Sequence, residues 1–282
     1  MDFRHYFDNP FERNVMDIEY SVLGHFCDWD CPTGNTEQHF RKAIERGFDG
    51  LKCDIELSKD GEIVLCHDPG FTIDANGRIA RWFDENNYRP IHEMTLQELM
   101  ALKFADEYEG QISTPCPLNT LLGLCRENNL AAYLTLRPEP WRNETAKRMS
   151  ELILANDMQR QTIINLYPGS KEAMDFVSSL IPDMVYCNTR EPQDELTTQL
   201  IDDSAADGYN IICMYRKQIE KVTPEMCRYA ASKGIHIWDW ENTDVNDVAR
   251  DIAKGVTGFQ MFSRDVTISV IKDILSKLPP TL

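Results

Sequence analysis

The alternation of strand-like and helix-like segments constrains this chain more than any other feature of its sequence. Beyond residue 130, short apolar runs alternate with longer stretches whose apolar residues recur every three or four positions. We predict strands there at 130–137, 162–166, 184–187, 210–215, 235–240 and 258–262. The intervening helices are predicted at 144–156, 171–180, 195–203, 224–233 and 245–253. Strands that alternate with helices form a parallel sheet, because each helix carries the chain back to the start of the next strand.

The first half of the chain supplies two more strands, at 20–25 and 50–57, and a short apolar run at 63–66. Its helices are predicted at 36–46, 95–102 and 118–127, with Thr95 and Glu98 forming a capping box. A last helix carries Ile268, Ile271, Ile274 and Leu275 on one stripe. Eight strands in 282 residues fit one (β/α)₈ TIM barrel, whose usual size is about 250 residues. A doubly wound sheet is the alternative, but no Gly-x-Gly-x-x-Gly follows the first strand.

We therefore predict a single α/β domain over residues 1–282. The turn-rich, aromatic segment 69–94 is interpreted as an excursion over the barrel mouth, because loops of this length are usually functional or disordered. The sequence determines neither the role of this excursion nor the oligomeric state.

The composition excludes some classes of partner. A formal charge of −17 disfavours nucleic acids and anionic membrane surfaces, which are bound through clustered Lys and Arg. A few local cations would still suffice for a small anionic substrate. The chain has no apolar run long enough to span a bilayer and no signal-peptide pattern at Met1. Its nine cysteines are scattered without a Cys-x-x-Cys pair, which is typical of reduced thiols in a cytoplasmic protein.

The strand at 50–57 carries a charged face. Alternate side chains of a strand share a face, so Lys52, Asp54 and Glu56 point one way and the apolar residues between them point the other. Two histidines flank this strand, His25 at the end of the preceding strand and His67 after the run 63–66. Barrel active sites lie at the carboxyl ends of the strands, and histidine can gain or lose a proton near neutrality. The pattern therefore favours acid–base chemistry.

The order of these motifs resembles the glycerophosphodiester phosphodiesterase family. The resemblance rests on Gly24-His25, Asn35-Thr36, Gly47-Phe48-Asp49, Asp54, Lys59-Asp60-Gly61 and His67-Asp68. It extends to Pro117-Leu118, to the stretch around Gly234, Trp238 and Asn242, and to Gly255-Val256-Thr257-Gly258.

The resemblance implies a TIM barrel that hydrolyses small glycerophosphodiesters in lipid metabolism. His25 and His67 would be the general acid and base, and a neighbouring glycerol hydroxyl would attack phosphorus before the cyclic phosphate is hydrolysed. A divalent cation, Mg²⁺ or Ca²⁺, would be held by carboxylates, with Asp54 as one ligand. Arg137 stands where the family has a lysine that contacts phosphate, and Trp238 would lie near the substrate.

Three positions depart from the family pattern. Phe26 replaces an arginine, and Lys52 and Thr135 replace two glutamates that bind metal in the family. In one interpretation Lys52 acts as a built-in cation, and little or no metal is needed. In another, Glu56 joins Asp28 or Asp30 in a displaced metal site. Two functional hypotheses follow: a phosphoric diester hydrolase with reduced or no metal dependence, or a pseudoenzyme that binds a phosphorylated ligand or a protein partner without turnover.

Overall fold

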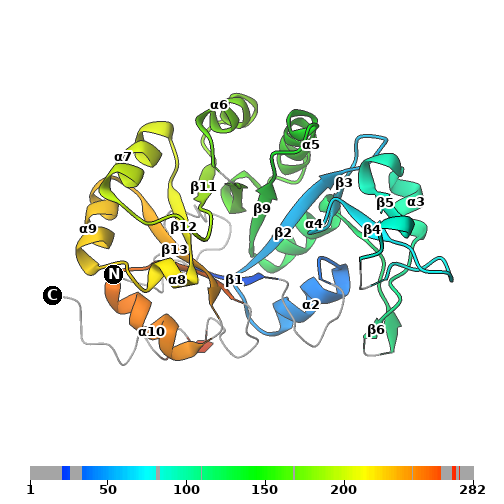
Figure 1. Cartoon of the computed structure of the whole chain (residues 1–282), viewed down its shortest axis with the longest axis horizontal. Helices are drawn as coiled ribbons and strands as arrows, with labels where there is room; N and C mark the ends of the chain where they lie inside the picture. Colours follow the sequence, from blue (N-terminus) through cyan, green and yellow to red (C-terminus); the bar gives the residue numbers. More distant parts are fainter. Residues whose placement is uncertain are drawn as a thin grey trace.

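The computed structural model describes residues 21–25, 34–80, 83–108, 110–167, 169–242, 244–261, 269–270 and 273. Eight parallel strands form a ring in which each strand pairs with the next, and β1 pairs with both β14 and β2 (Figure 1). The strands are β1 (Ser21–His25), β2 (Gly50–Leu57), β9 (Ala131–Leu136), β10 (Thr162–Leu166), β11 (Val185–Thr189), β12 (Ile211–Tyr215), β13 (His236–Asn242) and β14 (Gly258–Met261). The predicted α/β architecture and its parallel strand order are confirmed.

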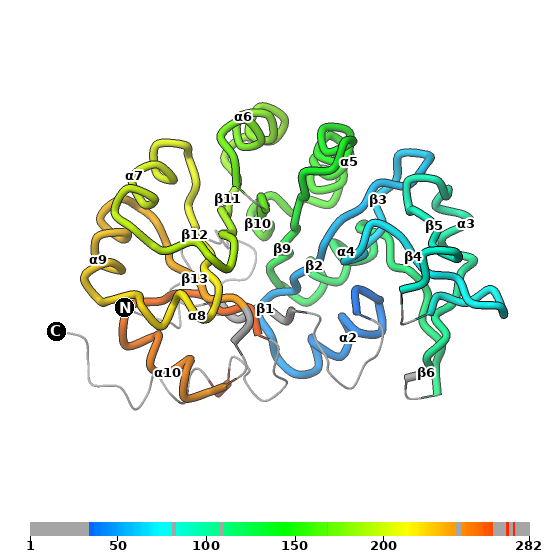
Figure 2. The backbone as a smooth tube through the Cα atoms, in the orientation of Figure 1, coloured from blue at the N-terminus to red at the C-terminus, as the bar shows by residue number. Residues whose placement is uncertain are grey.

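Helices cover the outside of this ring, as the backbone trace in Figure 2 shows. They are α2 (Glu37–Glu45), α4 (Leu118–Asn128), α5 (Arg142–Ala155), α6 (Lys171–Leu180), α7 (Thr198–Asp207), α8 (Arg216–Ile219), α9 (Pro224–Ser232) and α10 (Val245–Lys254). The larger apolar core lies between strands and helices, and a smaller one around Tyr133 and Trp238 fills the inside. Most of the predicted closing helix lies outside the described residues. None of the described helices has the length and apolar character needed to cross a membrane.

A subdomain-like excursion separates β2 from α4. It contains β3 (Ile63–Leu65), β4 (Gly70–Thr72), η3 (Glu85–Asn87), β5 (Tyr88–Pro90), η4 (Ile91–Glu93), α3 (Leu96–Ala101), β6 (Glu107–Tyr108), β7 (Gln111–Ile112) and β8 (Cys116–Pro117). Phe71, Ile91 and Leu99 belong to a small core of its own. The Thr95–Glu98 capping box is present. Figure 1 shows the excursion on the side of the barrel where β3 and α4 lie; that it covers the mouth stays a prediction.

A buried ion network fastens α8 and α10 to β13. Arg216 Nη1 lies 2.9 Å from Asp251 Oδ2 and 3.8 Å from Asp239 Oδ2, and Arg216 Nη2 lies 3.0 Å from Asp247 Oδ2. Asp239 and Asp251 are fully buried. Because a buried carboxylate without its cation is costly, removing the arginine should weaken the whole carboxyl-terminal part of the barrel.

We expect Arg216→Met to lower the free energy of unfolding by about 3 kcal/mol, measured by urea denaturation. The matched control is Arg228→Met, since Arg228 pairs with Glu225 at 2.7 Å on the exposed surface of α9. Exposed pairs contribute about 1 kcal/mol or less, so this control should stay close to the wild type. Equal losses in the two variants would contradict a special role for the Arg216 network.

Candidate active site

The charged face of β2 lines a cavity inside the barrel. Lys52 and Asp54 line this space of about 110 Å³, while Leu51, Cys53 and Ile55 pack into the outer core. The alternation predicted for this strand is therefore the one observed. Lys52 and Asp54 are 6% and 1% exposed, so both charges are held away from bulk water.

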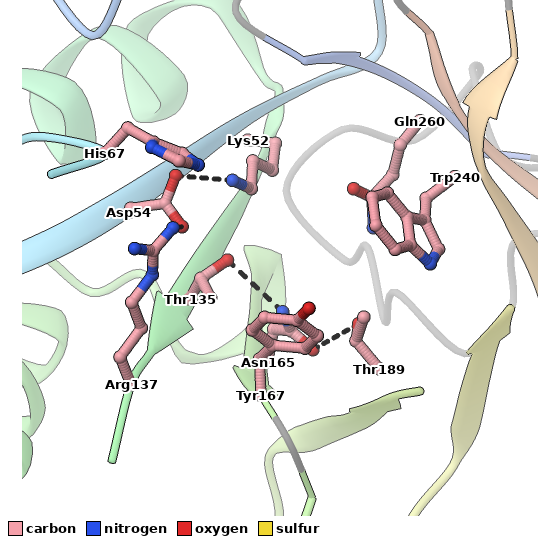
Figure 3. Close-up of a pocket in the computed structure, with 10 residues that line it drawn as sticks. All are labelled: Lys52, Asp54, His67, Thr135, Arg137, Asn165, Tyr167, Thr189, Trp240 and Gln260. Carbon is pink, nitrogen blue, oxygen red and sulfur yellow. Dashed lines mark hydrogen bonds and ion pairs between the residues drawn. The ribbon is translucent and has the colours of Figure 1, made fainter. Parts of the chain in front are cut away.

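Asp54 is held between two cations. Its Oδ2 lies 2.5 Å from Lys52 Nζ, and its Oδ1 accepts a hydrogen bond from Arg137 Nη2 at 3.2 Å. Arg137 directly follows β9, which pairs with β2 so that Asp54 stands beside Thr135. Both carboxylate oxygens are engaged, and the three groups together carry one net positive charge. Figure 3 shows this triad on one side of the cavity.

The two predicted catalytic histidines come from segments that neighbour β2: His25 ends β1, and His67 follows β3. His67 lines the cavity, is about half exposed, and its Nδ1 is 2.9 Å from Asp68 Oδ1. This hydrogen bond is the main cause of a lowered pKa for Asp68. His25 ends β1, where its backbone is level with Lys52. The side chain of His25, and all of Phe26, Asp28 and Asp30, lie outside the described residues.

Neutral polar side chains form the floor of the cavity. Asn165 Nδ2 donates to Thr135 Oγ1 at 3.2 Å, and Thr189 Oγ1 donates to Asn165 Oδ1 at 2.7 Å. Tyr133 continues this series of hydrogen bonds, with its hydroxyl 3.2 Å from Thr189 Oγ1. Asn165 and Thr189 were missed from the sequence, although a polar residue on the inner face of an apolar strand is the signal that would have found them.

The wall opposite the triad contains Trp240, with Tyr167 and Gln260 also lining the cavity (Figure 3). The tryptophan predicted near the substrate, Trp238, lies deeper instead. It is 3% exposed, its ring stacks on Tyr133 at a centroid distance of 5.9 Å, and it lies against Gly258, where a Cβ would be 2.2 Å from the indole. Trp238 thus supports the site from within the inner core, and Trp240 is the tryptophan that reaches the cavity.

Comparisons with known proteins test the resemblance found in the sequence. Residues 29–201 match the model of the glycerophosphoryl diester phosphodiesterase family. A glycerophosphodiester phosphodiesterase from Caldanaerobacter subterraneus is 31% identical over 262 residues, which cover 89% of this chain and 97% of that protein. This chain belongs to the glycerophosphodiester phosphodiesterase family.

Solved structures of low sequence identity share the fold of this chain. An Oleispira antarctica phosphodiesterase in complex with the product sn-glycerol-3-phosphate has a TM-score of 0.75 at 15% identity, with 92% of this chain and 99% of that chain covered. A glycerophosphodiester phosphodiesterase from Agrobacterium tumefaciens has a TM-score of 0.67 at 20% identity, with 87% and 98% covered.

The described residues of this family member do not fit the divalent cation that the family normally uses. Mg²⁺ and Ca²⁺ require several oxygen ligands, yet the ammonium of Lys52 and the neutral Thr135 stand where carboxylates are expected. Asp54 already binds two cationic side chains. Within the described part of the chain, no group of three His, Cys, Asp or Glu side chains is arranged to hold a metal ion.

Glu56 is the third charged residue of the β2 face, and it is 2% exposed. Burial, followed by the nearby charge of Glu139, raises the pKa of Glu56 to about 8. The displaced metal site, in which Glu56 would join Asp28 or Asp30, stays a prediction, because both aspartates lie outside the described residues.

The raised pKa of Glu56 makes stability depend on pH. Between about pH 4.5 and 8 the folded protein holds a proton that the unfolded chain releases, so stability falls as the pH rises through this window. Glu56→Gln removes this penalty. We expect the variant to match the wild type near pH 4.5 and to be more stable by on the order of 4 kcal/mol above pH 8.

Urea denaturation at a series of pH values checks this expectation. Glu127→Gln is the control, because it removes an exposed carboxylate from the end of α4, away from the mouth of the barrel. A constant difference between Glu56→Gln and the wild type across the pH range would contradict the assignment.

Proposed function

We propose that this protein is a phosphoric diester hydrolase that acts on a glycerophosphodiester-like small molecule. The observation that carries the proposal is the convergence of Lys52 and Arg137 on Asp54, in a cavity that His67 also lines. Fixed cations in a buried site stabilise the charge that develops on a phosphoryl group. Asp54 holds the two cations in place, and their excess positive charge is available to a phosphate.

The proposed reaction has two steps. A hydroxyl of the glycerol unit attacks phosphorus as its proton passes to one histidine, and the departing alcohol oxygen takes a proton from the other. Water then opens the resulting cyclic phosphate, with the two histidines exchanging roles, and leaves glycerol phosphate. His67 and His25 are the proposed pair, and Asp68 orients His67 through their hydrogen bond. Lys52 and Arg137 replace the charge that a divalent cation supplies in the family.

Hydrolysis of glycerophosphocholine and glycerophosphoglycerol, with EDTA and with added Mg²⁺ or Ca²⁺, tests the proposal. Turnover should survive EDTA and fall by about 10²–10⁴-fold in both His25→Ala and His67→Ala. His5→Ala is the matched control, since His5 belongs to no motif of the site. Turnover that appears only with added metal would contradict the role of Lys52 and Arg137.

A pseudoenzyme is the second candidate, because the Lys52–Asp54–Arg137 triad already satisfies much of its own charge. It would bind a phosphorylated ligand without turnover. Glycerol phosphate should then raise the melting temperature, while every diester stays intact over long incubation. Stabilisation that is lost in Lys52→Met would place this binding in the cavity.

A further inference from the structure

Thr135 presents a hydroxyl on the cavity floor, at a position where the resemblance to the family implies a metal-binding carboxylate. It is 3% exposed and pairs with Asp54 across strands β9 and β2, so it lies beside the triad of the proposed phosphate site. A carboxylate can only accept hydrogen bonds, whereas a hydroxyl can also donate one. The direction of the hydrogen bonds on the floor therefore determines what Thr135 offers to a ligand.

The side-chain amide of Asn165 sets this direction. Its carbonyl oxygen Oδ1 accepts a hydrogen bond from Thr189 Oγ1 at 2.7 Å, so its nitrogen Nδ2 faces the other way and donates to Thr135 Oγ1 at 3.2 Å. An amide nitrogen can donate hydrogen bonds but cannot accept one. The oxygen of Thr135 is therefore the acceptor in this bond, and its hydrogen is left to be donated elsewhere.

The same direction holds at the deep end of this series of hydrogen bonds. The Tyr133 hydroxyl lies 3.2 Å from both Thr189 Oγ1 and Cys187 Sγ. Burial raises the pKa of Tyr133, so this hydroxyl keeps its proton and acts as a donor. Because Thr189 gives its own hydrogen to Asn165, its oxygen can accept the one from Tyr133. Each donor thus points from the inner core toward the cavity, and the series ends at Thr135.

Two hydrogens at this end of the series have no acceptor in the part of the chain that the structure describes. One is the hydroxyl hydrogen of Thr135, and the other is the second hydrogen on Asn165 Nδ2. Both residues are 3% exposed and line the cavity next to the triad (Figure 3). Buried donors without an acceptor cost free energy, and a charged oxygen of a ligand would accept from both.

We propose that Thr135 and Asn165 form an anion hole, which donates two neutral hydrogen bonds to one non-bridging oxygen of the phosphodiester. This inference rests on the proposed function, in which Lys52 and Arg137 hold the same phosphate. Preorganised donors in a site away from bulk water stabilise the charge that develops on such an oxygen. Thr189 is a positioning residue, because its hydrogen bond fixes the orientation of the Asn165 amide.

Replacement of a phosphate oxygen by sulfur tests the proposal, because sulfur is a weak acceptor of hydrogen bonds. The two phosphorothioate diastereomers of glycerophosphocholine or glycerophosphoglycerol, whichever diester the wild type hydrolyses faster, are assayed in EDTA. The wild type should hydrolyse the diastereomer with sulfur at the floor roughly tenfold more slowly than the oxygen diester. Thr135→Val should lower kcat/KM for the oxygen diester by about 10²-fold. It should also bring this sulfur effect to within about twofold of unity and leave that of the other diastereomer unchanged.

Thr162→Val is the matched control, because it removes a buried hydroxyl from the start of β10, where Thr162 Oγ1 donates to the carbonyl oxygen of Met158 at 2.9 Å. It should keep the wild-type kcat/KM and both sulfur effects. Thr135→Ser retains the hydroxyl and should retain the sulfur effect. Thr189→Val lets the Asn165 amide turn and should weaken the same sulfur effect, whereas Thr189→Ser should keep it. The Thr189 pair keeps the test valid if Thr135→Val does not fold.

Two results would overturn the proposal. One is a loss in Thr135→Val that is equal for the oxygen diester and both phosphorothioates, which indicates a purely structural effect. The other is a Thr135→Val variant that matches the wild type on all three substrates, which would mean that the Thr135 hydroxyl donates to Asn165 and not to the phosphate.

Failure of the proposed function gives a different result, in which the wild type hydrolyses neither diester. The anion hole is then tested by calorimetric binding of glycerol phosphate to the wild type, Thr135→Val and Thr135→Ser. Binding that is about tenfold weaker in Thr135→Val and close to the wild type in Thr135→Ser would support an anion hole without turnover. Equal affinities in the three proteins, or no binding to the wild type, would overturn it.

Discussion

Replacing Lys52 with methionine should lower kcat/KM for a glycerophosphodiester by about 10²–10³-fold, the usual loss when one fixed donor to a developing charge is removed. Methionine preserves most of the apolar stem but removes the ammonium. Asp54 would keep its bond to Arg137, so the net charge of the group would fall from one positive charge to zero. The phosphate would then meet no excess cation in the cavity.

Steady-state kinetics in EDTA measure this loss. Lys59→Met is the matched control, because Lys59 lies on the exposed turn between β2 and β3 and should leave kcat/KM unchanged. Lys52→Arg keeps the charge and should retain much more activity than Lys52→Met. A Lys52→Met variant within about threefold of the wild type would show that the ammonium is not a substitute for metal.

The fold was predictable from the sequence because its signals are local. The strands at Gly50–Leu57 and Thr162–Leu166 and the helix at Lys171–Leu180 begin and end as predicted. Hydrophobic periodicity determines such elements before any tertiary contact forms. The charged face of β2 was predictable for the same reason, since strand parity alone places Lys52 and Asp54 together.

The pairing between strands was less predictable, because it depends on contacts far apart in the chain. Arg137 was expected to meet phosphate, but the sequence did not indicate that it also binds Asp54, 83 residues away. A register shift in β13 between Trp240 and Asn242 is equally invisible from the sequence. This irregularity accompanies the placement of Trp240 at the cavity, while Trp238 lies in the inner core.

The environment of Glu56 shows a second limit of prediction from the sequence. Its raised pKa depends partly on the charge of Glu139, which comes from the loop after β9 and could not be placed beside it from the sequence. The short hairpin β6–β7 between α3 and β8 was not predicted, because two-residue strands are too short to give a periodic signal.

The resemblance to the family implies glutamates at the positions of Lys52 and Thr135, which suggests an experiment in which glutamates are placed there. In Lys52→Glu/Thr135→Glu the cavity would hold three carboxylates, with Asp54 no longer bound to the lysine ammonium. Hard cations favour such a set of oxygen ligands. We expect Ca²⁺ at a hundredfold excess over its Kd to stabilise this variant by about 2.7 kcal/mol, and to leave the wild type unchanged.

Thermal and urea unfolding with Ca²⁺ or EDTA measure this difference. Lys52→Gln/Thr135→Gln is the matched control, because its side chains have nearly the same size as the glutamates but carry no charge. It should show no calcium response. If Ca²⁺ stabilised the wild type as strongly as the glutamate variant, a metal would already bind without these two carboxylates, and the displaced site around Glu56 would replace Lys52 as the explanation. A calcium response confined to the glutamate variant would instead show that Lys52 and Thr135 are the changes that remove metal from this barrel.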